Sequence, residues 1–142
     1  MMLLGRWLVR VVLVVPLVIV VALALNPVES RAVGRDKERV GLLRRVGSAV
    51  GDYKKDNEDY PPRETWRLEL TEGQYINSVP EGFEYAKAED GVIVYFGLEA
   101  PKNNRKCGGG EHAWAVYSSV EARAGTVCSA VSPTPGKQSF ID

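Results

Sequence analysis

The chain has 142 residues, and an apolar segment occupies its first quarter, so the remainder is long enough for one small domain with a thin core. Lysine and arginine together number 18, as do aspartate and glutamate, so the formal net charge is zero. This balance leaves no net field to steer the chain toward nucleic acid or an anionic membrane surface, and we therefore expect neither partner.

The first predicted element is an apolar helix over residues 1–27. From Val11 to Leu25 the sequence contains no charged side chain. A helix over this run is about 22 Å long, shorter than a hydrocarbon core of about 30 Å, unless Arg10 snorkels toward the head groups. We predict that this helix anchors the chain in the inner membrane or packs in a filament core, through Val11, Val14, Pro16, Val18, Val21 and Leu25.

Two features of the same region leave its role open. Arg6 and Arg10 precede the apolar run and Ala22–Ala24 resembles a small-residue cleavage site, so a cleaved secretory signal is the alternative to an anchor. The orientation is contested as well. Cations within residues 31–39 outnumber Arg6 and Arg10, which by the positive-inside rule would keep the domain in the cytoplasm. The two cysteines instead favour a head outside the cytoplasm, in the periplasm or at the cell surface.

Residues 28–60 are predicted to form an amphipathic helix that packs on the following domain. Apolar side chains recur at intervals of three or four, or their sum, and charged residues fill the remaining face. Gly41, Gly47 and Gly51 each cost about 1 kcal/mol relative to alanine within a helix, which indicates close approach of a sheet to the backbone. The small-xxx-small spacing of Gly47 and Gly51 is therefore interpreted as intramolecular packing. The predicted apolar stripe is Val33, Val40, Leu43, Val46, Val50 and Tyr53.

The end of this helix is predicted at Asp56–Asp59. Pro61 and Pro62 forbid its continuation, because proline has no amide hydrogen and restricts the residue before it. The acidic run lacks the alternating ligands and the following glutamate of a calcium loop. We therefore expect a solvated helix end and no metal site.

Strand composition begins after this loop, and residues 61–131 are predicted to form a small antiparallel meander that the amphipathic helix covers. Asp90-Gly91 is the strongest turn signal, because this pair accepts the positive φ angles of a tight hairpin. Pro101–Glu111 is predicted to be a mobile loop and residues 132–142 an irregular tail. The predicted strands are Tyr75–Val79, Phe83–Ala86, Val92–Phe96, Ala113–Tyr117 and Thr126–Cys128.

The two cysteines are Cys107 and Cys128, and neither belongs to a CxxC motif or to a Cys/His cluster with metal-ligand spacing. If they pair, they close a loop of about 22 residues, which the chain-entropy model values at roughly 3 kcal/mol. A disulfide requires an oxidising compartment, and two buried free thiols are the alternative.

Catalytic constellations are weak in this sequence. The single histidine, His112, has no serine or cysteine nucleophile arranged around it by a recognisable motif, and no acid–base pair stands out. We therefore expect neither an enzyme nor a small-molecule substrate or cofactor.

Three segments of the first half of the chain form a pattern: an Asn-Pro in Ala24–Pro27, a charged helical run at Arg35–Arg39, and Tyr-x-x-Asp-Asn-x-x-Tyr-Pro at Tyr53–Pro61. Phe96–Glu99 and Ala115–Ser119 follow, flanked by the cysteines. Together these segments resemble bacterial type IV pilins and the pseudopilins of type II secretion, in which the later two look like the sheet and the disulfide-bounded region.

The resemblance implies an α+β fold with a long N-terminal helix, its apolar half in a filament core or the inner membrane and its other half packed on the sheet. One position departs from the family. Counted without gaps, Arg6 falls where such proteins carry a glutamate that pairs with a neighbouring subunit's N-terminal amine. We expect a single-pass minor pilin or pseudopilin that works with other pilin-like subunits and their assembly machinery. The alternative is a binding module that keeps the pilin head and does not assemble.

Overall fold

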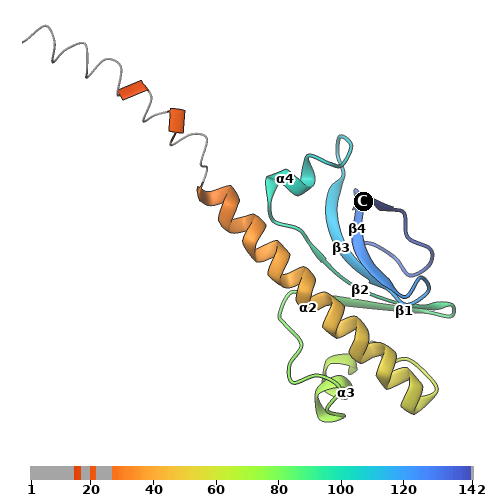
Figure 1. Ribbon diagram of the computed structural model, residues 1–142. Coiled ribbons are helices and arrows are strands. Elements are labelled where there is room, and N and C mark those ends of the chain that lie inside the picture. The colour runs from red at the N-terminus through yellow and green to blue at the C-terminus, as the bar shows by residue number, and fades with distance from the viewer. Residues whose placement is uncertain (1–14, 17–19, 22–26, 142) are drawn as a thin grey trace, which may run out of the picture.

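The computed structural model describes residues 15–16, 20–21 and 27–141 and has an α+β architecture (Figure 1). A long helix, α2 (Pro27–Asn57), runs across one face of a sheet and projects beyond it (Figure 1). This arrangement confirms the predicted α+β class and the long N-terminal helix that packs on an antiparallel sheet. The remaining elements are α3 (Trp66–Glu72), β1 (Glu84–Ala88), β2 (Gly91–Gly97), α4 (Pro101–Asn104), β3 (His112–Ser118), β4 (Arg123–Ser129) and β5 (Phe140–Ile141).

The main core lies between α2 and the sheet. Leu43, Val46 and Val50 of the predicted apolar stripe are fully buried, because their spacing places them on one face of the helix. The prediction that the amphipathic helix covers the sheet is therefore confirmed. The buried residues that pack with them are Trp66 and Leu70 from α3 and Phe83, Tyr85, Val92, Val94, Phe96, Leu98, Ala113 and Ala115 from the sheet and its connections.

The sheet is an antiparallel meander with the strand order β1-β2-β3-β4-β5. In the first hairpin Ala88 pairs with Gly91, so Glu89 and Asp90 form the connecting turn. The hairpin is confirmed, but the predicted turn pair Asp90-Gly91 is wrong by one residue, because Gly91 already pairs in β2. Space restricts Gly91, since a Cβ atom there would lie 2.7 Å from the hydroxyl oxygen of Ser119.

The opposite face of the sheet carries a second, smaller core of Ile93, Tyr95, Val116 and Val127. Side chains alternate along a strand, so these residues point away from α2. Phe140 of the C-terminal segment packs on this cluster, and β5 pairs with β4. The tail predicted as irregular therefore ends in a fifth strand, because its apolar side chain covers sheet surface that would otherwise be exposed.

Two other segments differ from their predictions. The predicted strand Tyr75–Val79 is a loop, since the amides of Tyr75 and Ile76 donate to the Leu70 carbonyl and close the end of α3. The apolar side chains of this loop pack against the main core instead of joining the sheet. Within the predicted loop Pro101–Glu111, the first residues form the short helix α4, with Pro101 in its first turn.

No helix within residues 15–16, 20–21 and 27–141 combines the length and the apolar character that crossing a bilayer requires. This finding contradicts the predicted single-pass membrane protein with an outward-facing head, and that prediction is wrong. The long helix α2 is excluded as a membrane-spanning helix because its exposed face carries charged side chains, among them Arg31, Lys37 and Arg44. Pro16 and Val21 are helical and exposed. The predictions for Arg6, Val11, Val14, Val18 and Leu25 concern positions outside the described residues.

Candidate functional site

A buried carboxylate joins α2 to the rest of the described fold, the sheet with α3 and α4, which we call the head. Asp36 is only 3% exposed, and its oxygens accept hydrogen bonds from the amides of Glu99 (3.0 Å) and Ala100 (2.9 Å). The Asn103 side-chain amide donates a third, at 2.7 Å. The carboxylate therefore satisfies two backbone donors just before α4, of which the Ala100 amide would otherwise be buried without a partner. We call these four residues the stalk–head clamp.

Ion pairs surround this clamp. Glu99 accepts from Arg35 and Arg39, each at 3.0 Å, and these side chains are partly exposed, so the pairs add little stability by themselves. The Arg39 guanidinium also lies over the Phe96 ring, 4.3 Å from its centroid. Arg39 therefore links the surface pair to the core, and the orientation of α2 on the sheet is defined at several points.

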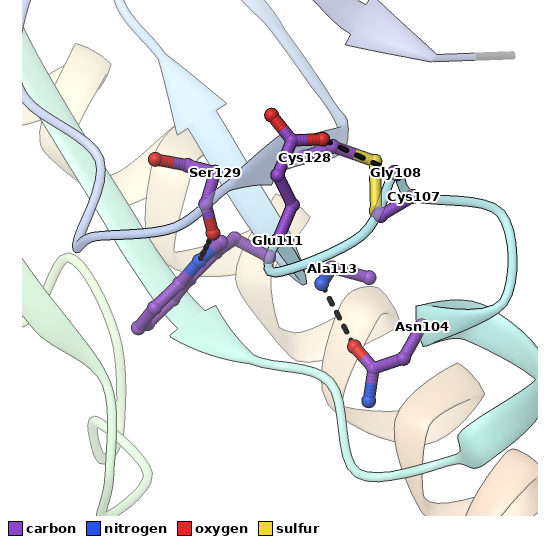
Figure 2. Close-up of a disulfide and its surroundings, with 8 residues drawn as sticks. Asn104, Cys107, Gly108, Glu111, Ala113, Cys128 and Ser129 are labelled. Atoms are coloured by element: carbon purple, nitrogen blue, oxygen red, sulfur yellow. Dashed lines mark hydrogen bonds between the residues drawn. A yellow bond between two sulfur atoms is a disulfide. The ribbon is translucent and has the colours of Figure 1, made fainter.

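The predicted disulfide joins Cys107 to Cys128, with the Cα atoms 5.4 Å apart (Figure 2). The bridge connects the segment after α4 to β4. Across the ends of this segment Ala113 of β3 donates its amide to the Asn104 side chain of α4 at 2.8 Å, and within it Gly108 donates to the Glu111 carboxylate at 3.3 Å (Figure 2). The loop that the sequence predicted as mobile is thus held at several points, and the Cys107–Cys128 pairing is confirmed.

Two helix glycines, at positions 47 and 41, have opposite surroundings. A Cβ atom on Gly47 would lie 2.4 Å from a ring carbon of Tyr117, so only glycine allows the ring of β3 to approach α2 this closely. A Cβ atom on Gly41 would meet nothing within 4 Å. The predicted close approach of the sheet is correct at Gly47 and wrong at Gly41. Burial raises the pKa of the Tyr117 phenol, and the charges of Tyr60 and Asp52 raise it further.

Hydrogen bonds to the loop after α3 and to β1 hold the C-terminal end of α2 and the residues that follow it. The Tyr75 hydroxyl donates to Asp56 at 3.0 Å and accepts from the Asn57 amide at 3.2 Å. Lys87 of β1 donates to Asp59 at 2.8 Å, and this hydrogen-bonded ammonium holds the pKa of the Asp59 carboxyl below its usual range. Within the part of the chain that the structure describes, no group of His, Cys, Asp and Glu side chains is arranged to hold a metal ion.

Surface hollows lie on both sides of α2. One of about 520 Å³ lies between α2 and the loop after α3, and its lining includes Arg45, Asp52 and Tyr75. Another of about 460 Å³ lies between α2 and the head, beside Lys37 and Arg44. Both are open surface depressions with mixed polar and apolar walls. The sequence did not indicate either, because each wall comes from segments far apart in the chain.

Apolar side chains are exposed toward the N-terminal end of the described residues. Val20 is 62% exposed and Val28 is 74% exposed. About five helical turns separate Val28 from Val46, so both face the same side of α2. Val46 is fully buried under the sheet, whereas Val28 lies where no sheet covers it. Of these two valines, only Val20 belongs to the apolar run Val11–Leu25, and Val28 lies beyond its end.

Comparisons of the chain with protein-family models, with curated proteins and with solved structures give no match.

Proposed function

We propose that this protein is a pilin-like structural subunit, a minor pilin or pseudopilin of a type IV pilus or type II secretion-type filament. The observation that carries the proposal is the exposure of Val20 and Val28, which lie N-terminal to the part of α2 that the sheet covers. Exposed apolar side chains remain in contact with water until another surface covers them. A neighbouring subunit with the same helix provides such a surface.

The construction of the head also supports a structural role. The stalk–head clamp holds α2 on the sheet through a buried carboxylate, and the disulfide ties the segment after α4 to β4. The clamp resists rotation of the helix against the head, so a load applied to the helix by a neighbouring subunit reaches the sheet, and the disulfide holds the segment that follows Asn103 of the clamp. The disulfide also requires an oxidising compartment. The function is then carried by surface contacts with other subunits and their assembly machinery, and no catalysis or nucleic-acid binding is involved.

Crosslinking of the full chain in intact cells tests this proposal. The wild-type protein is expected to give a ladder of crosslinked subunits. Replacing Val20 and Val28 by glutamine removes the two most exposed of the described N-terminal valines without adding charge, and the ladder should disappear. The matched control replaces Leu68 and Val131, which are 53% and 70% exposed on the head, by glutamine. The control should keep the ladder.

Only monomers in the wild-type lane would refute the filament subunit. They would favour the second candidate, a non-assembling binding module with a pilin-like head. The observation behind that candidate is the hollow of about 520 Å³ beside α2, in which Arg45 and Asp52 offer opposite charges to a ligand. A ladder that survives in the Val20/Val28 variant would show that subunits meet through another surface.

A further inference from the structure

The charges of this neutral chain are separated along α2. Residues 52–90 contain eleven acidic and five basic residues, a net charge of −6, whereas residues 27–51 contain six basic and three acidic residues. The acidic segment forms the end of α2, α3 and β1, and the basic segment forms the half of α2 that begins near α4 (Figure 1). The molecule is therefore electrically polarised along its long helix.

The basic half contains a groove. Lys37 and Arg44 stand on its α2 wall, both exposed, and neither forms an ion pair with a described residue. Gly41 lies between them, and the open space above it leaves room for an approaching chain. Asp36 is the acidic group in this lining, and its oxygens are already bonded within the clamp. We call this hollow of about 460 Å³ the basic groove; its other lining residues are Val33, Val40, Leu98, Asn103 and Thr126.

The acidic half ends in a protrusion. Glu58 follows the last residue of α2, and Glu89 and Asp90 form the turn of the first hairpin. All three are exposed and form no ion pair with a described residue. The two segments are neighbours, because Lys87 donates both to Asp59 and to the carbonyl of Tyr60 at 2.8 Å. We call Glu58, Glu89 and Asp90 the acidic tip.

We infer that the acidic tip of one copy docks in the basic groove of the next copy, an inference that rests on the proposed function. Charge complementarity identifies the occupant, since one chain carries both unpaired surfaces and its total charge is zero. The groove and the tip lie at different positions along the axis of α2, and a helical rise of about 1.5 Å per residue separates Arg44 from Glu58 by about 20 Å. Such a contact joins two different surfaces, so it repeats head to tail and gives a filament its polarity.

Charge reversal on the full chain tests this docking. Lys37→Glu with Arg44→Glu reverses the groove, and Glu58→Lys with Glu89→Lys reverses the tip. Each variant alone should lose its crosslinked ladder by roughly tenfold or more, since like charges then face each other. An equimolar mixture of the two variants should restore the ladder, because each reversed surface meets its complement on the other variant. Lys106→Glu with Lys137→Glu, exposed cations outside the groove, is the charge-matched control and should assemble normally.

A zero-length carbodiimide crosslink gives the contact directly. In a mixture of ¹⁵N-labelled and unlabelled wild-type chains, mixed-isotope peptides should join Lys37 to Glu58, Glu89 or Asp90. Ladders that persist in both reversal variants, or variants that fail to rescue each other while remaining folded by circular dichroism, would overturn the docking and leave the filament subunit standing. A wild-type chain that forms no ladder with any crosslinker would overturn both.

Discussion

Substituting alanine at Gly47 and at Gly41 should change stability in opposite directions. Both glycines lie in α2, both lack a side chain, and both substitutions add a single methyl group. Alanine is favoured over glycine in a helix interior by about 1 kcal/mol, so helix propensity alone predicts the same gain at each site. Tertiary contacts make the difference.

The expected magnitudes follow from the surroundings of each added methyl group. At Gly41 nothing lies within 4 Å of the new Cβ, so the whole gain of about 1 kcal/mol should be observed. At Gly47 the new Cβ would lie within 2.6 Å of ring carbons of Tyr117. Overpacking of this kind costs about 1 to 3 kcal/mol, which offsets the propensity gain and leaves a net loss of about 1 kcal/mol. The two variants should therefore differ by about 2 kcal/mol.

Urea unfolding of the full chain, followed by tryptophan fluorescence, measures this difference. With a slope of about 1 to 3 kcal/mol per M for a small protein, the two midpoints should be separated by roughly 1 M. A Tyr117→Ala background provides the control. Without the ring, Gly47→Ala should become stabilising, and the coupling between the two sites should account for its loss in the wild-type background.

Equal shifts of the two variants would refute the reasoning. A gain at both sites would mean that the Tyr117 ring moves away from α2 at no cost. A loss at both would mean that Gly41 is already in contact with another surface. A Gly47→Ala loss that persists without the Tyr117 ring would show that a different neighbour causes it.

Further predictions concern the clamp, the disulfide and the buried phenol. Asp36→Ala leaves the backbone amides of Glu99 and Ala100 without this acceptor and should lower the free energy of unfolding by about 2 to 4 kcal/mol. Glu38→Ala removes an exposed acid of the same helix and should change the free energy of unfolding by less than about 0.5 kcal/mol. Equal effects of the two variants in urea titrations would contradict the clamp. Cys107→Ser with Cys128→Ser should cost about 3 kcal/mol, and a reductant should lower the unfolding midpoint of the wild type but not of this variant. Because burial raises the pKa of Tyr117 in the folded state, its stabilising contribution is complete below the unfolded pKa of about 10 and is lost as pH rises through the folded pKa. Unfolding midpoints between pH 9 and 12 should therefore fall less steeply for Tyr117→Phe, and identical pH profiles would contradict the raised pKa.

Local features of the chain determined much of this architecture. Leu43, Val46 and Val50 recur at helical spacing, and the turn before Gly91 joins two apolar runs, so α2 and the first hairpin follow from neighbours in the sequence. The disulfide followed from there being only Cys107 and Cys128 to pair. These features depend on periodicity, turn chemistry and composition, which are visible without knowing which segments meet.

Contacts between distant segments decided the rest. The sequence marks Asp36 as one more charged residue of an amphipathic helix, yet it is buried because the donors it satisfies come from a segment more than 60 residues later in the chain. Gly41 and Gly47 are equivalent in the sequence, and only the position of the Tyr117 ring separates them. The loop at Tyr75–Val79 has strand composition, but its amides bond to the end of α3. Periodicity shows which face of an element is apolar, whereas the tertiary structure decides what covers that face. The covering segment is distant in the chain, and the local sequence does not indicate which segment it is.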